Sequence, residues 1–384
     1  MPLKDIAGGG YKAYLTSFKE WTSILPRWNL NIESDSVYSM YNLFGIAVMF
    51  YLFKTVIEGS GGTGNYMIQR YFASRSDRES GLLSLFWTVL LSFRWPFIAA
   101  IAIMGISYGS SHGVIENPET VLPVVLKNVV HTGMKGLLVA GLMAAAMSTF
   151  DSTVNAGAAY WVKDIYQAFL NPQASEKTLM LHSRMASVFM VIIGLLLSLL
   201  IKNINEICGW ITMSIGAGMI IPQLARWYWW RLNGYGFAIG TGAGMAAAIF
   251  QRAAFPDVPE YISFSFASGI SLIAMIIGTL FTSPTDETTL QQFYEKTRPF
   301  GFWSHIKNSI PFHIIEKINK ENRRDIIATF FAVPWQVVLF LTMMMIVMQR
   351  WDTFAWLVTI LIVLSIGLYH FWYKHLSTEV KFDQ

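Results

Sequence analysis

The sequence predicts an all-α polytopic membrane protein, and three observations support this prediction. Hydrophobic residues make up 54% of the 384 residues and charged residues only 14%, against roughly a quarter charged in an average soluble domain. The mean hydropathy is positive, at +0.43. Long apolar runs recur along the chain, and each approaches the about 20 residues that a membrane-spanning helix needs. This composition excludes a disordered chain and a small disulfide-bonded secreted domain.

We expect about nine membrane-spanning helices. They lie at 37–58, 82–106, 137–161, 183–201, 208–229, 235–254, 261–281, 327–348 and 352–373. Two longer polar stretches remain, at 1–36 and 282–326.

The distribution of basic residues predicts the orientation of these helices. Most Lys and Arg residues fall on the side that holds 282–326 and the C-terminus, and positive charge marks the cytoplasmic side. The C-terminus is then cytoplasmic and the segment 1–36 extracellular. An extracellular start with no span before it is unusual. Either the first span is miscounted, or the chain is the C-terminal part of a longer protein.

Ionisable residues inside the predicted spans are costly in lipid and are therefore functional candidates. Lys54 and Glu58 are four residues apart, so they share a helix face; they either form a neutralising pair or act in solute binding or gating. Arg94 precedes Pro96, which frees a backbone carbonyl one turn earlier. Arg94 suits contact with a carboxylate, and the alternative is an ion pair with an acid of a neighbouring helix.

A glycine-rich run follows the first span at 59–64. Four glycines in six positions disfavour a regular helix. Irregular backbone at membrane depth occurs where it lines a cavity, as in the broken helices of transporters. We therefore favour a broken helix over an ordinary loop.

The third span carries a face of small and hydroxyl residues. Ala145, Ser148, Thr149 and Ser152 recur at i, i+3, i+4 and i+7, so they share one helical face. Hydroxyl oxygens are neutral ligands that suit a small cation, and Asp151 lies at the edge of the face. The alternative interpretation is packing, because Ser and Thr also join membrane helices by hydrogen bonds.

The sequence argues against a disulfide, a metal site, an enzyme active site and nucleic-acid binding. The single cysteine, Cys208, excludes an intrachain disulfide and a cysteine-based zinc site. The seven histidines show no metal-ligand spacing, and no nucleophile–base pair points to an enzyme. Basic residues are scattered, which argues against nucleic-acid binding. Gly236, Gly240 and Gly244 form a small-residue stripe for close helix contact.

Several segments resemble the sodium:solute symporter family, over most of residues 37 to 303. The run from Ala145 to the Asp-Ile-Tyr triplet at 164–166 is similar to the family's eighth core helix. The segment 65–70 resembles the inner end of its sixth core helix. Gly218 and Pro222 are placed as in its tenth, and 294–303 resembles a cytoplasmic loop of some bacterial members.

The resemblance implies roles for individual residues. It assigns sodium binding to one set: Ala145, Ser148, Thr149, Ser152 and Asp151. It assigns solute contact to a second set: Ser60, Gly61, Arg94 and Ser214. Arg70, at the inner end of the sixth core helix, is expected to pair with an acid of the first repeat. Sugar-carrying members hold larger aromatic and amide side chains in the solute set and a lysine on the seventh helix, so a sugar is not the expected solute.

The resemblance also implies a LeuT-type inverted-repeat fold that here lacks its first five-helix repeat. The expected organisation is an extracellular segment 1–36, the second five-helix repeat 37–229, two additional helices 230–281, a cytoplasmic loop 282–326, and a C-terminal helix pair with a short tail 327–384.

The expected function is sodium-coupled transport of a small organic solute across the plasma membrane, the inner membrane of a bacterium. The expected partners are Na⁺ as coupling ion, the solute, the lipid bilayer and a missing N-terminal repeat or completing chain, with no further cofactor. The alternatives are a transporter-derived sensor or a fragment without transport activity. A passive channel is disfavoured because no ring of charged residues resembles a selectivity filter.

Overall fold

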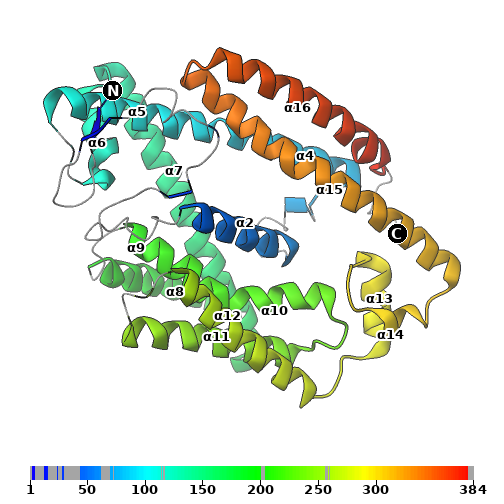
Figure 1. The fold of residues 1–384 in the computed structure, drawn as a ribbon. Helices are drawn as coiled ribbons and strands as arrows, with labels where there is room; N and C mark the ends of the chain where they lie inside the picture. Colours follow the sequence, from blue (N-terminus) through cyan, green and yellow to red (C-terminus); the bar gives the residue numbers. More distant parts are fainter. Residues whose placement is uncertain are drawn as a thin grey trace. The chain divides into compact units, whose positions relative to one another are not determined.

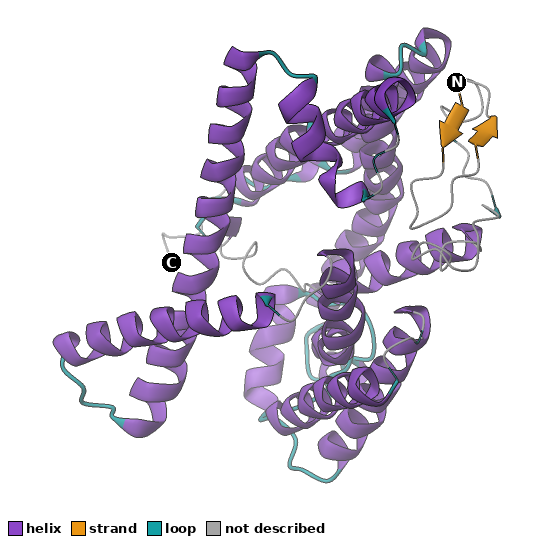
Figure 2. Ribbon diagram, turned by 90° about the vertical axis from the view of Figure 1, so that its left-hand side faces the viewer, coloured by secondary structure: helices purple, strands orange, loops and turns teal. Residues whose placement is uncertain are grey.

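The computed structural model describes residues 2–4, 13–15, 24, 28–29, 44–61, 70–71, 73–113, 115, 117–199, 204–255, 258 and 260–378. The regular structure in these residues is helical, apart from two short strands that pair antiparallel, β1 (Pro2–Lys4) and β2 (Ala13–Leu15) (Figure 2). Seven of the described helical segments are long and apolar enough to cross a membrane. The chain is therefore a multi-pass membrane protein.

The seven segments are Asp77–Gly109, Thr132–Leu170, Glu176–Ser198, Ile207–Tyr228, Tyr261–Leu280, Phe312–Val347 and Trp351–His375. The other two predicted spans fall on helices that do not reach this class. Helix α2 (Phe44–Gly61) has an apolar part, Val48–Ile57, that is too short. Helix α11 (Gly234–Ala254) is long enough, but its glycines lower its hydropathy. The count of about nine spans is not confirmed and stays a prediction.

The chain divides into two compact units, Glu119–Ile207 and the remainder. The smaller unit contains α6 (Val121–Asn128), α7 (Thr132–Ala159), the π-helical η3 (Tyr160–Leu170) and α8 (Glu176–Ser198). Two short elements cross its boundaries, η2 (Pro118–Thr120) and α9 (Ile204–Gly209).

Besides β1, β2 and α2, the larger unit holds a long series of helices (Figure 1). These are α4 (Asp77–Ser92), α5 (Arg94–His112), the π-helical η4 (Trp210–Ile215), α10 (Gly216–Tyr228), α11, α12 (Glu260–Leu280), α13 (Glu287–Thr297), α14 (Ser304–Lys307), α15 (Phe312–Val347), α16 (Trp351–Phe371) and η5 (Tyr373–His375).

Four helices begin at a side chain that caps their first turn. Ser76, Ser175, Asn233 and Asp286 precede α4, α8, α11 and α13, and each accepts a hydrogen bond from the amide three residues later. Such caps satisfy one of the free N–H groups at a helix start. Local sequence therefore fixes where these helices begin.

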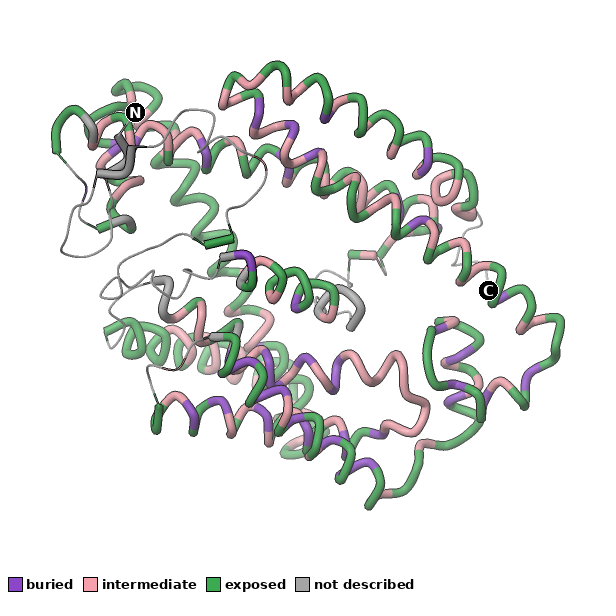
Figure 3. Tube along the Cα trace, in the orientation of Figure 1, coloured by how far each residue is buried: buried purple, intermediate pink, exposed green. Residues whose placement is uncertain are grey.

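The glycine stripe of α11 lies in a tight helix interface, as the sequence predicted. A Cβ on Gly244 would lie 2.6 Å from the Cα of Gly218 in α10, and one on Gly240 would lie 2.6 Å from the Cβ of Met275 in α12. Buried positions concentrate on these three helices (Figure 3). The absence of side chains at the stripe brings the backbones together, which is the main source of helix association in lipid.

Pro222 in the middle of α10 is compensated by a neighbouring helix. A proline lacks the N–H that would bond to the carbonyl four residues earlier, here that of Gly218. The hydroxyl of Ser271 in α12 donates to this carbonyl at 2.7 Å, and Ser271 is fully buried. An unsatisfied carbonyl is costly at membrane depth, so this hydrogen bond keeps α10 in place against α12.

The predicted span 82–106 consists of two successive helices, which meet at Phe93. The amide of Phe93 bonds back to the carbonyls of Leu90 and Leu91, which ends α4. Pro96, in the first turn of α5, leaves the carbonyl of Ser92 without its helical donor. The sequence predicted one span here with a carbonyl freed by Pro96, and that carbonyl, of Ser92, lies next to the interruption.

The predicted loop 282–326 is largely helical, because it has a core of its own. Helices α13, α14 and the first turns of α15 pack around a buried cluster: Leu290, Tyr294, Trp303, Ile306, Ile310 and Ile318. Trp303 donates its indole N–H to the carbonyl of Trp227 at 2.9 Å, which ties the cluster to the end of α10.

The hydroxyl of Thr288 and the amide of Thr289 hold the pKa of Asp286, the cap of α13, below its usual range.

Candidate functional site

The predicted sodium-binding residues lie on a single uninterrupted helix, α7. Their i, i+3, i+4, i+7 spacing therefore places Ala145, Ser148, Thr149 and Ser152 on one face of a real helix. Ser148 and Thr149 are exposed and Ser152 is half-buried.

The hydroxyl hydrogens of Thr149 and Ser152 are used within the helix. Thr149 Oγ1 donates to the carbonyl of Ala145 at 3.0 Å, and Ser152 Oγ donates to the carbonyl of Ser148 at 2.7 Å. Such back-bonding is common for Ser and Thr in membrane helices. A hydroxyl that has given its hydrogen to the backbone still carries two lone pairs. The face thus presents oxygen lone pairs, which are the groups that a hard cation binds.

The last turns of α7 pack against α8. A Cβ on Gly157 would lie 2.5 Å from the sulfur of Met190 in α8, and Ala158 is almost fully buried. At 3.6 residues per turn, Gly157 and Ala158 each lie about 130° around the helix from the centre of the hydroxyl face. Residues 141–151 are exposed on every side of α7, so the hydroxyl face is open together with the rest of this stretch (Figure 3).

Asp151 adds a carboxylate at the edge of the open face. It is exposed, and one of its carboxylate oxygens accepts a hydrogen bond from the amide of Asn155 at 3.0 Å. The second carboxylate oxygen remains an acceptor for a cation. The contribution of Asp151 to sodium binding stays a prediction.

The predicted solute residues are not brought together by the described part of the larger unit. Ser214 is buried in η4, whereas Arg94 is exposed at the first residue of α5. The backbones of Ser60 and Gly61 form the last turn of α2. The placement of their side chains, and residues 62–69 of the predicted broken helix, lie outside the described residues.

The predicted ion-pair residues also lie in the larger unit. Lys54 is buried in α2. Arg70 is exposed, and its guanidinium lies over the ring of Trp87 in α4, 5.8 Å from the centroid, a cation–π contact. The side chain of Glu58 lies outside the described residues, so the Lys54–Glu58 pair stays a prediction.

Two features of the larger unit escaped the sequence reasoning. The first is the π-helical turn η4, in which the amide of Gly216 bonds to the carbonyl of Ile211, five residues earlier. Single π turns inside helices are frequent at functional sites, but no residue type marks them in a sequence. The second is an apolar cavity of about 880 Å³. It is lined by residues of α2, α10 and α12 together with Trp229, Trp230, Phe302 and Ser304.

Comparison with known proteins places this sequence in a family. The profile of the sodium:solute symporter family matches residues 9–244, more than half of the chain. A high-affinity proline transporter of Bacillus subtilis is 25% identical over 266 residues, which are 66% of this chain and 54% of the relative. A sodium/glucose cotransporter of Vibrio parahaemolyticus is 24% identical over 296 residues, 73% of this chain and 54% of the relative.

An osmoregulated proline transporter of Bacillus subtilis is 24% identical over 218 residues, which are 53% of this chain and 43% of the relative. The chain thus spans about half the length of these curated relatives. All three are named as transporters and none as an enzyme. The chain belongs to the sodium:solute symporter family.

Proposed function

We propose that this chain supplies one half of a sodium-coupled symporter for a small organic solute. The observation that carries the proposal is the open hydroxyl face of α7. Thr149 and Ser152 give their hydrogens to the backbone and keep their lone pairs. The contact of α7 with α8 lies further along the helix, at Gly157, and leaves these hydroxyls uncovered.

The coupling ion is Na⁺, held by the hydroxyls of Ser148 and Thr149 with a carbonyl of the small-residue turn at Ala145. Ser152 and Asp151 extend the site towards a second ion position. Hydroxyls and carbonyls are neutral, so they bind the ion without trapping it. Each sodium ion that moves inward releases about 2.3 kcal/mol per 100 mV of membrane potential, which is the energy available for solute uptake.

A partner surface is needed to complete the ion site, because a single helix face supplies ligands from one side only. We propose that an inverted five-helix repeat supplies the rest, either in a longer polypeptide or as a separate chain. Two inverted repeats that hold both ligands between them are the LeuT-type arrangement. In this arrangement 37–229 is the second repeat, and the protein lies in the plasma membrane with a cytoplasmic C-terminus.

The solute in this proposal is a small carboxylate-bearing molecule such as an amino acid. Two of the relatives are named as proline transporters. Arg94 is exposed at the N-terminal end of α5, where the guanidinium and the helix N-terminus both attract a carboxylate. The other proposed solute residues are small, namely Ser60, Gly61 and Ser214. Their side chains would therefore leave space for the solute.

The test is solute uptake into proteoliposomes that contain this chain together with its completing repeat, under an inward sodium gradient, with radiolabelled proline and glucose as probes. We expect sodium-dependent uptake of proline, and its loss in the double variant Ser148→Ala with Thr149→Ala. Ser187→Ala is the matched control, because this hydroxyl of α8 also bonds to a carbonyl of its own helix and lies outside the proposed site. Unchanged sodium dependence in the double variant contradicts the ion site.

A further inference from the structure

The apolar cavity of about 880 Å³ in the larger unit contains none of the residues assigned to sodium or solute. Two stripes of its lining follow helix axes: Ile221, Leu224, Ala225 and Tyr228 in α10, and Leu272, Met275 and Ile276 in α12. At 1.5 Å per residue, the stripe of α10 is about 10 Å long. This is about two-thirds of one leaflet of a bilayer whose hydrocarbon core is about 30 Å thick. The cavity therefore matches an acyl chain that lies along the helices.

The lining of this cavity carries no charged side chain. Its other members are Val56 and Ile57 of α2, together with Trp229, Trp230, Phe302 and Ser304. Apart from Ser304, every lining side chain is apolar or aromatic. A polar solute would lose its hydration here without compensation, whereas an alkyl chain meets apolar contacts along its length.

The aromatic members of the lining gather where α10 ends, at Tyr228. The amide of Phe302 donates to the carbonyl of Tyr228 at 2.7 Å, and the amide of Trp230 donates to the carbonyl of Phe302 at 3.4 Å. Two backbone hydrogen bonds therefore hold the segment with Phe302 and Ser304 against this end. Tyr and Trp concentrate at the membrane–water interface, so this end of the cavity is expected at the level of the lipid head groups.

This end offers hydrogen-bond donors. The hydroxyls of Tyr228 and Ser304 and the indole N–H groups of Trp229 and Trp230 have no hydrogen-bond partner among the described residues. An indole N–H can only donate, and a hydroxyl can donate as well as accept. The ester and phosphate oxygens of a phospholipid are acceptors, and interfacial Trp and Tyr place their polar tips among such groups.

A partly buried cation, Arg231, lies beside the same end. It directly follows Trp230 and donates through Nη2 to the carbonyl of Thr282 at 2.9 Å, two residues beyond the end of α12. Among the described residues, no carboxylate lies within ion-pair distance of its guanidinium. Water and salt screen a partly buried charge less than an exposed one, so Arg231 attracts an anionic head group.

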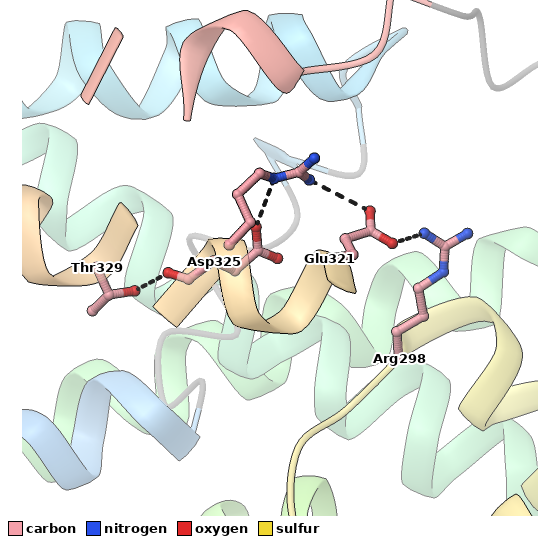
Figure 4. A network of polar contacts seen from close by, with 5 residues as sticks. Arg298, Glu321, Asp325 and Thr329 are labelled. Atoms are coloured by element: carbon pink, nitrogen blue, oxygen red, sulfur yellow. Dashed lines mark hydrogen bonds and ion pairs between the residues drawn. The ribbon is translucent and has the colours of Figure 1, made fainter. Parts of the chain in front are cut away.

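Lys307 adds a second positive charge. It lies one turn after Ser304 in α14, and the described residues place no carboxylate within ion-pair distance of it either. Two further arginines of this region are engaged elsewhere. Arg298 is paired with Glu321 of α15 (Figure 4), and Arg226 has interactions of its own.

The carboxylates at the start of α13 do not neutralise these two cations. Asp286 and Glu287 are exposed, so water screens their charges. Both are occupied: Asp286 accepts from the amide of Thr289 at 3.2 Å, and Glu287 lies 2.9 Å from Nε2 of His305. The side chain of Glu58, which follows the lining residue Ile57, lies outside the described residues, and a variant tests its contribution.

We propose that this cavity binds one acyl chain of an anionic phospholipid, with the phosphate at the end formed by Tyr228, Trp229 and Trp230. A neutral lipid fills the apolar part equally well, but it leaves the charges of Arg231 and Lys307 uncompensated. Because α2, α10 and α12 all contribute to the lining, the bound chain holds α2 against the other two helices. The proposal requires that the chain spans a membrane and does not depend on transport.

The test uses the full chain, delipidated in detergent, with native mass spectrometry to count bound lipids. Dioleoylphosphatidylglycerol and dioleoylphosphatidylcholine are titrated, because they share their acyl chains and differ in head-group charge. We expect one saturable site for phosphatidylglycerol, with an affinity about tenfold above that for phosphatidylcholine, the gain expected from one charge-assisted hydrogen bond. Glycerol phosphate, the head group without chains, should not compete at equal concentration. Equal affinities for the two lipids, or competition by glycerol phosphate, overturns the proposal.

Charge variants test the head-group end. Arg231→Gln is expected to remove the preference for phosphatidylglycerol, and Arg231→Lys, which keeps the charge, to retain most of it. The matched control is Lys296→Gln, because Lys296 is an exposed cation of α13 outside the lining. Glu58→Gln should also keep the preference. A preference that survives Arg231→Gln, or that is lost in Lys296→Gln or Glu58→Gln, contradicts the proposed site.

A cavity-filling variant tests the apolar end. Ala225→Phe occupies the cavity without changing charge, and we expect it to abolish the saturable site. Thermal unfolding in detergent checks its fold: phosphatidylglycerol should raise the unfolding temperature of the wild type and leave that of the variant unchanged. If a segment of the protein fills the cavity instead, the wild type shows no saturable lipid site, and the proposal is wrong.

Discussion

Replacing Gly244 with alanine tests whether the contact of α10, α11 and α12 is limited by backbone approach. The new Cβ would lie 2.6 Å from the Cα and 2.7 Å from the carbonyl oxygen of Gly218, and 2.7 Å from the Cβ of Ser271. Two of these atoms are backbone, so they cannot move aside by a change of rotamer. Overpacking of this kind costs about 1–3 kcal/mol, and we expect Gly244→Ala to lower the stability of the larger unit by that amount.

The matched control is Gly242→Ala on the same helix. A Cβ on Gly242 meets no atom within 4 Å, so this substitution adds only helix propensity, a gain of about 0.5–1 kcal/mol. The two alanines are therefore expected to shift stability in opposite directions. Unfolding of the purified protein in detergent, followed by circular dichroism, measures both. A shift of the same sign in both variants refutes the close-packing argument.

Three other predictions follow from single contacts. Ser271→Ala leaves the carbonyl of Gly218 unsatisfied and lowers stability by about 1–3 kcal/mol; Pro222→Ala restores a backbone donor to this carbonyl, so the double variant loses less, which a double-mutant cycle of unfolding measures. Burial raises the pKa of Tyr294, and its hydroxyl has no hydrogen-bond partner among the described residues. We therefore expect Tyr294→Phe to keep or raise stability at neutral pH. The wild type should lose stability as alkaline pH ionises the phenol, and the variant should not lose this part, which unfolding curves between neutral and alkaline pH measure. The pKa of Asp286 is lowered, so its carboxylate caps α13 at neutral pH and loses this role as pH falls through the folded-state pKa. Hydrogen exchange of the amides in the first turn of α13 should then become faster in acid, relative to exchange in the first turn of α11. The cap of α11 is the uncharged Asn233, which serves as the control.

Sequence patterns predicted the features of this fold that depend on local composition. The glycine stripe of α11 lies in a close interface because small residues every fourth position leave a groove along one helix face. Pro96 lies beside the break between α4 and α5. In the same way, the hydroxyl residues from Ser148 to Ser152 lie on one helix because nothing in that stretch interrupts it.

Features that depend on distant partners were not predictable. The segment 282–326 is polar in composition, but it folds because Trp303 and Tyr294 pack together and Trp303 bonds to Trp227, 76 residues away. The charged network from Arg298 to Asp325 likewise joins residues that no periodicity relates. Composition alone reads such a segment as a loop, because its apolar residues are few and irregularly spaced.

The hydroxyls of α7 and α12 all donate to backbone carbonyls, but they differ in which helix holds the carbonyl and in whether the hydroxyl stays exposed. In α12, the hydroxyls of Ser268 and Ser271 donate to the carbonyls of Ala217 and Gly218 in α10 and are buried by the contact. In α7, the hydroxyl of Thr149 donates within its own helix and remains exposed. A hydroxyl that joins helices gives its hydrogen to a neighbouring helix, whereas one that binds a cation must keep its lone pairs accessible. The serines of α12 therefore serve packing, whereas Thr149 keeps the accessible lone pairs that the proposed sodium site requires.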